Sequence, residues 1–420
     1  KIFKKEKNKL EIQKNKLEKK LFKMLPTYKP VIISIEDIAE KLGNDDILIE
    51  YQLYQPVAKN YENLDAKYLA FTLDNQKNVK IYDLGSAEKI NPSVSKVINS
   101  AENKKGDFNN NLQKIKELIL TPLEKDLKTK KNIYISPDNE LNRIPYSAFN
   151  LKFEDSIEKF KNIRVLTSSK ELMEIKKLVK NKKVNKTLIV ANPTFDINNE
   201  NSQDDEYISQ QRSVDLRNLK WTSLPGTLKE GKAINKIIKA NFLTNKEASV
   251  LNVQKYESPK LLHIASHSYY LPSKRDELSL LRSGIVLAGA NNPFQNPVDD
   301  GYLTALEATN LNLNGTDLVV ISGCESGQGD VKLGQGLYGL RRSFAVAGAK
   351  SQLLSLWKVD DLGTAAFMEV FYENLKKGLP KDIALRNTQK VFQNHPIPSW
   401  RHPYIWAAFQ LSGSWNPINF

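Results

Sequence analysis

The sequence predicts an α/β fold in which a mostly parallel sheet is covered by helices on both faces. Apolar runs of about five or six residues recur in the C-terminal half, at 260–265, 284–288, 317–322 and 351–356. Amphipathic helical patterns lie between and after them, at 335–347, 360–377 and 380–393. Strands that read as nearly continuous apolar runs, separated by helices, are typical of parallel sheets buried on both faces.

The N-terminal half is predicted to contain further strands and helices. Ser34 begins a capping-box pattern, and a short helix should follow it to about Leu42. The expected strands are 46–54, 68–73, 79–84, 132–136, 163–167 and 187–191. The expected helices are 87–104, 109–127, 227–239 and 246–254, with one more starting near Ser169, and a final strand is expected at 404–411.

Length and composition describe an ordinary globular protein with room for two or three domains. Of 420 residues, 40% are hydrophobic and 26% are charged. No apolar run approaches the roughly 20 residues that span a bilayer, and the N-terminus lacks the apolar core of a signal peptide. Because the chain begins with Lys1, we expect it to be the C-terminal part of a longer protein or a processed chain. A single cysteine excludes an internal disulfide, which indicates a reducing, cytoplasmic setting.

Basic residues are concentrated at the N-terminus. The net charge is +14, and the first 23 residues hold ten Lys and only three Glu. Residues 1–25 read as one charged helix with leucines at near-heptad spacing. We favour a solvated lysine-rich helix, with nucleic acid or an acidic protein as the alternative partner of this segment. The stretch 196–211 is polar and acidic and is predicted to be a surface loop.

Two predicted strands end in residues that could perform chemistry. The run 261–265 leads to His267, and the run 317–322 leads to Cys324. Ligands bind at the carboxyl ends of strands in open parallel sheets, so parallel strands would place both side chains at one edge. A thiol with a pKa near 8.5 needs a neighbouring base at neutral pH, which an imidazole supplies. A backbone carbonyl near His267 is expected to orient the ring.

Each of these residues also has a purely structural interpretation. A lone cysteine at a strand end is often a small core residue, and His263 reads as a buried core histidine. His395 and His402 lie in a proline-rich connection and read as loop or packing residues. The histidines lack zinc-ligand spacing, and no phosphate-binding loop is present, so no metal and no cofactor is expected. A serine hydrolase is disfavoured because the Gly-x-Ser-x-Gly elbow is missing.

The C-terminal half of the chain resembles the CHAT domain, a caspase- and separase-related family that often follows tetratricopeptide repeats, and the resemblance extends over most of the chain from about residue 45. The matching segments are 224–227, 262–267, 281–290, 300–308, 320–327, 339–342, 355–361 and 402–409, with 47–54, 132–148 and 163–171 resembling the family's N-terminal half. Among the clearest are Leu-His-Ile-Ala-Ser-His, which ends at His267, and Val-Ile-Ser-Gly-Cys-Glu-Ser-Gly around Cys324.

The resemblance implies a caspase-like α/β fold, with a mostly parallel sheet flanked by helices and two tandem lobes. The expected organisation is an N-terminal helical region at 1–43, a pseudo-protease lobe at 44–195, an acidic loop at 196–215 and a catalytic lobe at 216–420. The family's catalytic residues map to His267 and Cys324, with the amides of Ser268 and Cys324 as oxyanion donors. Two departures are Ser268, where the family has glycine, and Gly323, where it commonly has alanine and where glycine is expected to loosen the turn.

The expected activity is that of a cysteine endopeptidase that cleaves a specific protein after a basic P1 residue. The carboxylates of Asp360 and Asp361, with Glu325 as a secondary candidate, are expected to line the S1 pocket. Asp360 could instead cap the following helix. The resemblance further implies an activating partner or sensor that acts through N-terminal repeats, with no membrane involvement. The alternative function is a non-catalytic interaction scaffold in which Cys324 is a packing residue.

Overall fold

The computed structural model describes Lys16 and residues 32–58, 64–104, 106–149, 162–175, 185–197, 219–271, 279–293, 299–323 and 335–420, with the backbone alone at 335–338. Apart from Lys16, the predicted helix at 1–25 lies outside these residues, as does most of the acidic loop. So do Cys324 and Glu325.

A single eleven-stranded sheet runs through the molecule in the order β3-β2-β1-β4-β5-β14-β13-β12-β8-β6-β7. Its first half consists of β1 (Asp46–Tyr54), β2 (Lys67–Leu73), β3 (Val79–Ser86), β4 (Asn132–Ser136) and β5 (Asn162–Val165). Its second half consists of β6 (Leu188–Pro193), β7 (Asn241–Asn245), β8 (Leu261–Ala265), β12 (Leu318–Ile321), β13 (Ser351–Ser355) and β14 (Phe409–Gly413). The sheet is mostly parallel, so the predicted fold class is confirmed.

Most strands of the second half run opposite to β1, β4 and β5 of the first half. β1, β4, β5 and β14 are mutually parallel, and so are β13, β12, β8, β6 and β7. The reversal comes at the antiparallel pair of β13 and β14. The carboxyl ends of β1, β4 and β5 therefore lie at the opposite edge of the sheet from those of β8, β12 and β13.

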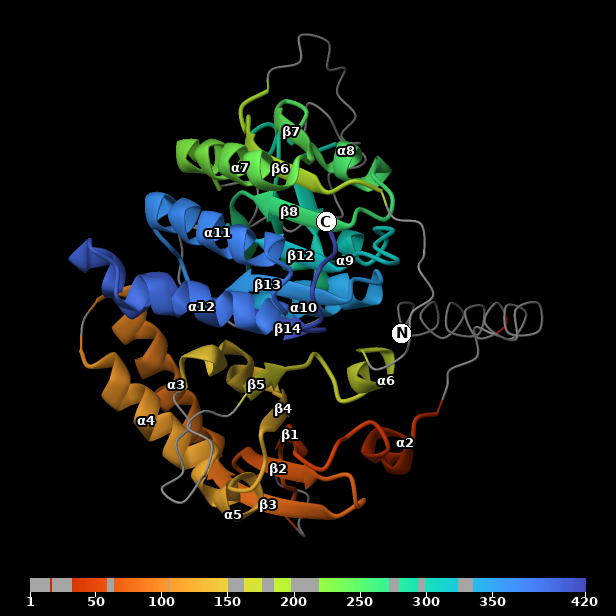
Figure 1. Ribbon diagram of the computed structural model, residues 1–420, viewed down its shortest axis with the longest axis vertical. Helices are drawn as coiled ribbons and strands as arrows, with labels where there is room; N and C mark the ends of the chain where they lie inside the picture. The colour runs from red at the N-terminus through yellow and green to blue at the C-terminus, as the bar shows by residue number, and fades with distance from the viewer. Residues whose placement is uncertain are drawn as a thin grey trace, which may run out of the picture.

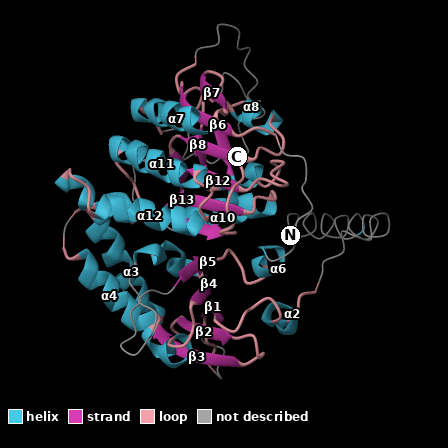
Figure 2. Cartoon of the chain, viewed as in Figure 1, coloured by secondary structure: helices cyan, strands magenta, loops and turns pink. Residues whose placement is uncertain are grey.

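Helices cover both faces of the sheet (Figure 1). One face carries α3 (Ala87–Glu102), α4 (Phe108–Ile119), α7 (Pro225–Ile238), α11 (Asp361–Lys376) and α12 (Lys381–Gln393). The other carries α2 (Ile35–Ala39), α6 (Glu171–Ile175), α8 (Val250–Lys255), α9 (Ala305–Ala308) and α10 (Gln335–Val346). Figure 2 shows the strands as one central layer between them. Ile49 of β1 and Phe409 of β14 belong to the same buried cluster, so the two halves share a hydrophobic core.

A small antiparallel sheet lies outside the main one. It consists of β9 (Ser268–Tyr270), β10 (Ser283–Val286) and β11 (Tyr302–Thr304), with β10 in the middle. The apolar run at 284–288, predicted to be a strand of the parallel sheet, contributes instead to β10. That part of the prediction is wrong because a short buried strand has the same apolar appearance in either sheet.

Other elements differ from the prediction in ways that have local causes. The capping box of Ser34 is confirmed, with Asp37 as its second member. The helix expected at 109–127 ends at Ile119, and a 3-10 turn that contains Pro122 follows before α5 (Glu124–Leu127). The strand expected at 404–411 begins as the short helix α13 (Pro403–Trp406), and β14 follows. Strand β6, which the predicted boundary placed in the first lobe, lies in the second half of the sheet.

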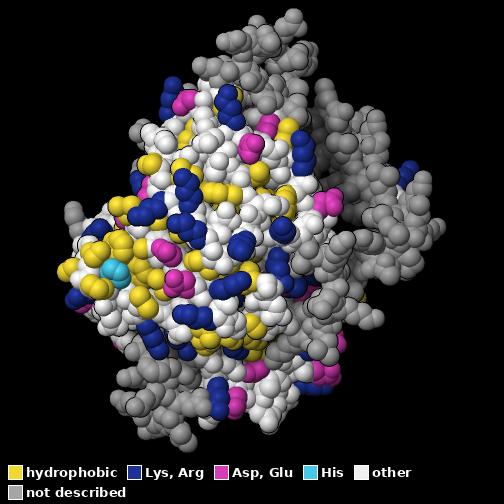
Figure 3. All heavy atoms as spheres, turned by 45° about the horizontal axis from the view of Figure 1, so that its top comes forward, with side chains coloured by type: hydrophobic (Ala, Val, Ile, Leu, Met, Phe, Trp, Pro, Cys, Tyr) yellow, Lys and Arg dark blue, Asp and Glu magenta, His cyan; other side chains and the backbone are white. Residues whose placement is uncertain are grey.

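Charged side chains are mixed on the surface. Figure 3 shows basic side chains spread over one face, with acidic and apolar side chains between them. On the described part of this face there is no continuous basic patch. The lysine-rich segment for which the sequence left an acidic or nucleic-acid partner open lies, apart from Lys16, outside the described residues. Among the described helices, none combines the length and apolar character needed to cross a bilayer.

Candidate active site

Two adjacent strands lead to the predicted catalytic positions. β8 and β12 pair in parallel, with Leu318 opposite Leu261 and Ile321 opposite Ile264. Both strands are buried along their whole length. His267 follows the end of β8 by two residues, so it lies at the carboxyl edge of this half of the sheet. The predicted parallel arrangement of these two strands is confirmed.

The backbones of the two strand ends touch immediately before the predicted catalytic residues. A Cβ atom added to Gly323 would lie far inside the van der Waals contact distance of the Ser266 carbonyl oxygen. Glycine at 323 therefore lets the end of β12 approach the end of β8, which is a steric role that differs from the expected loosening of the turn. The Ser355 hydroxyl also donates to the Gly323 carbonyl at 2.8 Å. Cys324, the next residue of the chain, lies outside the described residues.

The His267 ring is fixed by a main-chain carbonyl. Its Nε2 lies 2.8 Å from the carbonyl oxygen of Thr222, and its residue is only 3% exposed. A carbonyl can only accept, so Nε2 carries the proton and Nδ1 is the basic nitrogen of the neutral ring. A backbone carbonyl that orients His267 was predicted from the sequence, but the sequence did not identify Thr222 as the residue that supplies it.

Aromatic side chains enclose the same ring. Phe195 and Trp221 each lie with their ring centroids 5.3 Å from that of His267. The Trp221 indole donates to the Tyr302 hydroxyl at 3.0 Å, which fixes this wall to β11. Burial lowers the pKa of His267, the Thr222 carbonyl raises it, and the charge of Lys358 lowers it further. The net direction is downward, so the imidazole is neutral at neutral pH and can accept a proton.

Asn291 holds the segment that carries Trp221 and Thr222. Its Oδ1 accepts from the Trp221 amide at 2.8 Å, and its Nδ2 donates to the Trp221 carbonyl at 3.0 Å. Nδ2 also donates to Asp196 Oδ1 at 3.1 Å. The backbone amide of Asn291 donates to the Phe195 carbonyl at 3.1 Å. One residue thus positions both aromatic neighbours of His267 and the carbonyl that orients it, and the sequence contains no motif that points to it.

Ser268 has a geometry that suits its predicted role as an amide donor. The Val286 amide donates to the His267 carbonyl at 2.8 Å, which makes 267 and 286 a hydrogen-bonded pair of the small antiparallel sheet. Hydrogen-bonded pairs alternate with non-hydrogen-bonded pairs along an antiparallel ladder. Ser268, opposite Ile285, therefore belongs to a non-hydrogen-bonded pair, and its amide does not donate to β10. Because β9 is an edge strand, this amide points away from the small sheet.

The two predicted pocket carboxylates have different surroundings. Asp360 Oδ2 accepts from the Gly363 amide at 2.8 Å, so Asp360 is the N-cap of α11. Asp361 packs against α7, since a Cβ on Gly226 would lie 2.5 Å from its Cβ. Burial raises the pKa of Asp361, as do the charges of Asp360 and Glu230, while Lys358 lowers it. The charge of Lys358 lowers the pKa of both Asp361 and His267, so these two side chains lie near the same ammonium group.

His263 is a core residue, as predicted. It is fully buried, and its Nδ1 lies 3.0 Å from the Tyr372 hydroxyl. Its Nε2 lies 3.0 Å from Glu230 Oε1, but that oxygen has no aligned hydrogen bond, so the contact is one of proximity. His395 stacks on Phe392 and makes a tilted ring contact with Trp400, in the predicted packing role. In the described part of the chain, no group of three His, Cys, Asp or Glu residues is arranged to hold a metal ion.

Comparisons with known proteins agree with this architecture. The model of the CHAT domain family matches residues 109–414, which is more than half of the chain. A 118-residue stretch is 36% identical to Tetratricopeptide repeat protein 28 of Mus musculus and 35% identical to that of Homo sapiens. Each match covers 28% of this chain and 5% of the relative, so the chain corresponds to a small part of those proteins.

Two solved structures are similar at low identity. The Saccharomyces cerevisiae separase–securin complex matches with a TM-score of 0.47 and 12% identity, over 92% of this chain and 31% of that one. The Arg-specific cysteine proteinase gingipain R matches with a TM-score of 0.40 and 8% identity, over 74% of this chain and 68% of that one. On the strength of the family match, the chain belongs to the CHAT domain family.

Proposed function

We propose that this protein is a cysteine endopeptidase in which Cys324 is the nucleophile and His267 the general acid–base. The observation that carries the proposal is the backbone contact between Gly323 and Ser266 at the ends of two parallel strands. It brings the described ends of the two strands together, which supports a pairing of the residues that follow them. A neutral His267 with its proton on Nε2 offers Nδ1 as the proton acceptor for the thiol.

The reaction divides into two steps. The Cys324 sulfur attacks the peptide carbonyl while His267 takes the thiol proton. The ring then gives this proton to the leaving amine as the C–N bond breaks. Water hydrolyses the acyl-enzyme with the same ring as base. The amides of Ser268 and Cys324 are the proposed oxyanion donors, each worth roughly 2.7–4 kcal/mol. The buried surroundings of His267 support this role, because they favour the neutral ring.

Substrate preference is proposed to be for a basic P1 side chain. Asp361 is the stronger candidate for the pocket carboxylate, because the Asp360 carboxylate already caps α11. The raised pKa of Asp361 would fall when a guanidinium or ammonium group binds beside it. Glu325 remains a secondary candidate outside the described residues. Matched Arg-P1 and Leu-P1 substrates test this idea: Asp361→Asn should lower kcat/KM for the first alone.

Control by a partner is proposed to act through the N-terminal segment. Relatives with the tetratricopeptide-repeat name share part of this sequence, which supports a helical sensor in front of the protease. The single cysteine fits a nucleophile kept reduced in the cytoplasm. Removal of residues 1–25 should change either the peptidase activity or its dependence on a partner. If both stay unchanged, the proposed control through this segment is wrong.

The decisive experiment is covalent labelling of the full chain with an Arg-P1 acyloxymethyl ketone. Labelling should be lost in Cys324→Ala and should fall roughly 100-fold or more in His267→Ala. His395→Ala is the matched control, because this histidine packs against Phe392 and Trp400 beyond the end of α12, and it should label like the wild type. Since Cys324 is the only cysteine, mass spectrometry assigns any thiol adduct directly.

The contrary result would favour the non-catalytic scaffold. In that case, ketones with basic, acidic and apolar P1 groups would all fail to label the folded wild type, including in the presence of candidate partners. Labelling that is equal in wild type and His267→Ala would also contradict the proposed pair, because it would show a thiol that reacts without assistance.

A further inference from the structure

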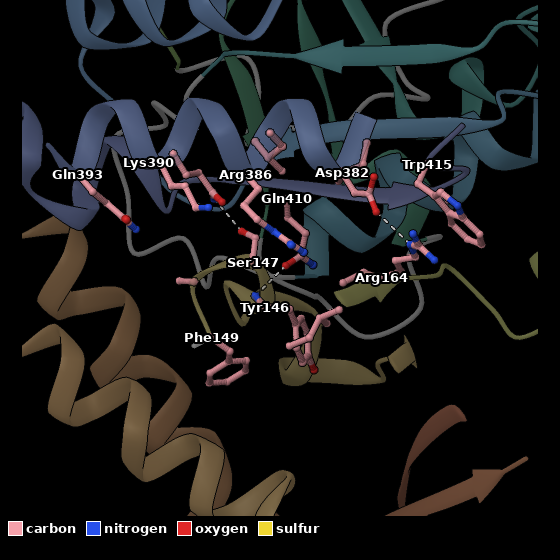
Figure 4. Close-up of a pocket in the computed structure, with 17 residues that line it drawn as sticks. Tyr146, Ser147, Phe149, Arg164, Asp382, Arg386, Lys390, Gln393, Gln410 and Trp415 are labelled. Atoms are coloured by element: carbon pink, nitrogen blue, oxygen red, sulfur yellow. Dashed lines mark hydrogen bonds and ion pairs between the residues drawn. The ribbon is translucent and has the colours of Figure 1, made fainter. Parts of the chain in front are cut away.

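A polar cavity lies at the junction of the two halves of the sheet, away from the candidate active site. Its volume is about 180 Å³. One wall comes from residues 146–149 and 163–165 of the first half, and the other from α12 and β14. The α12 residues that line it recur every three or four positions, which puts them on one side of the helix: Asp382, Leu385, Arg386, Gln389, Lys390 and Gln393. Figure 4 shows this side of α12 facing the first half.

The cavity carries an excess of positive charge. Among the described residues that line it, three are cations, Arg164, Arg386 and Lys390, and one is a carboxylate, Asp382. Arg164 Nε donates to Asp382 Oδ2 at 3.0 Å. Arg386 donates instead to a neutral oxygen, Asn162 Oδ1, at 2.9 Å.

Arg386 is therefore a half-buried cation with little compensating charge among the described residues. Burial lowers the pKa of its guanidinium, and the charge of Arg164 lowers it further, against the opposite influence of Asp382. A guanidinium has five N–H donors in a planar fork that fits a carboxylate or phosphate group. A bound anion would supply the charge that the protein does not.

A second observation points to a ligand in the same cavity. Gln410 is 1% exposed, and its Oε1 accepts from the Tyr146 amide at 3.2 Å. Its Nε2 has no hydrogen-bond partner. The neighbouring Gln389 differs, because its Nε2 donates to Ser147 Oγ at 2.9 Å and to the Trp406 carbonyl at 3.1 Å. A buried amide donor without an acceptor is uncommon in folded proteins, and an acceptor atom in the cavity would satisfy it.

We propose that this cavity binds a small oxyanion, the phosphate or carboxylate group of a small molecule, through Arg386 and the Gln410 amide. The volume limits the ligand, since pockets for drug-sized molecules begin near 300 Å³. The site is also placed to affect the assembly of the two halves. They join where β5 and β14 pair, with Ser412 opposite Val165, and the ligand would contact both sides of that junction. The proposal is independent of the protease chemistry.

Calorimetry and thermal unfolding of the full chain test it, with inorganic phosphate and citrate as probes at matched ionic strength. At least one anion should bind with 1:1 stoichiometry at a Kd below about 10 mM and raise Tm by a few degrees at saturation. Binding of phosphate alone would identify a phosphate group, and binding of citrate alone a carboxylate. If neither binds, the proposal is overturned.

Three variants assign the binding to this cavity. Arg386→Gln should weaken it about tenfold or more, whereas Arg342→Gln, which removes an exposed arginine elsewhere, should not. Gln410→Glu keeps the acceptor for the Tyr146 amide and places a carboxylate near Arg386. It should abolish anion binding and raise the Tm of the anion-free protein, which an unfolded variant could not do. Equal anion binding by wild type, Arg386→Gln and Gln410→Glu would place the anion elsewhere and refute the proposal.

Discussion

The two edges of the sheet where parallel strands end are built differently. At the carboxyl end of β4, in the first half, the polar residue is Asp138, and its carboxylate accepts from the amides of Leu53 and Asn139, both at 2.8 Å. That half has no histidine and no cysteine between 44 and 187. At the carboxyl end of β8, in the second half, the polar residue is His267, which is held by Thr222 and enclosed by two aromatic rings.

The comparison shows how one architecture can serve two purposes. The Asp138 carboxylate closes a turn, because it satisfies main-chain amides of β1 and of the 3-10 helix Asn139–Arg143. The groups around His267 instead fix the orientation and the protonation state of a ring that can exchange protons near neutral pH. The first edge should tolerate changes that leave its hydrogen bonds intact. The second should lose function when a backbone contact or a charge is altered.

The largest effect is expected from the glycine that lets the two strand ends meet. Gly323→Ala should slow labelling of Cys324 and cost about 3 kcal/mol or more in the free energy of unfolding, because the added methyl overlaps the Ser266 carbonyl and forces the two strand ends of this chain apart. Gly43→Ala, in the first half, is the matched control. Its added Cβ would have its nearest neighbour, Asp46 Oδ2, at 3.5 Å, which is ordinary contact.

Chemical denaturation and ketone labelling of both variants measure the difference. A Gly323→Ala protein that is as stable as the wild type and labels at the same rate would mean that the contact between the two strand ends is not needed for the site.

A smaller effect is expected from the residue that positions the orienting carbonyl. Asn291→Asp keeps the acceptor for the Trp221 amide but loses the donor to the Trp221 carbonyl, and it places a second carboxylate near Asp196. We expect kcat to fall about tenfold, since one hydrogen bond is worth about 1 kcal/mol and the repulsion adds to its loss. KM should change little, because Asn291 acts through Trp221 and Thr222.

The neighbouring Asn292→Asp is the control, since the Asn292 amide donates to the Ile197 carbonyl and not to the segment that carries Thr222. Steady-state kinetics on one peptide substrate separate kcat from KM. Equal losses in the two variants would indicate a general disturbance of this loop and not a positioning role for Asn291.

Much of the fold and part of the site could be predicted from the sequence, and the missing parts have physical causes. The strands that lead to His267 and Cys324 are buried on both faces, so they read as apolar runs with the correct bounds to within a residue or two. Strand β7 was missed because it is a partly exposed edge strand that begins and ends with asparagine. Thr222 and Asn291 were missed because one acts through a main-chain atom and the other through tertiary contacts, neither of which leaves a residue pattern.

The smallest effect is a shift in pH dependence caused by one charge. The charge of Lys358 lowers the pKa of His267, in addition to the larger effect of burial. Below that pKa the ring is protonated and cannot take the proton of Cys324, so the acid limb of kcat/KM follows it. Lys358→Met removes the charge, raises the pKa and should move the limb to higher pH. Lys358→Arg keeps the charge and should leave it in place. If the acid limb of kcat/KM stays at the same pH in Lys358→Met, the group that titrates is not His267. The carboxyl edge of the second half would then lack the proton acceptor that distinguishes it from the carboxyl edge of the first half.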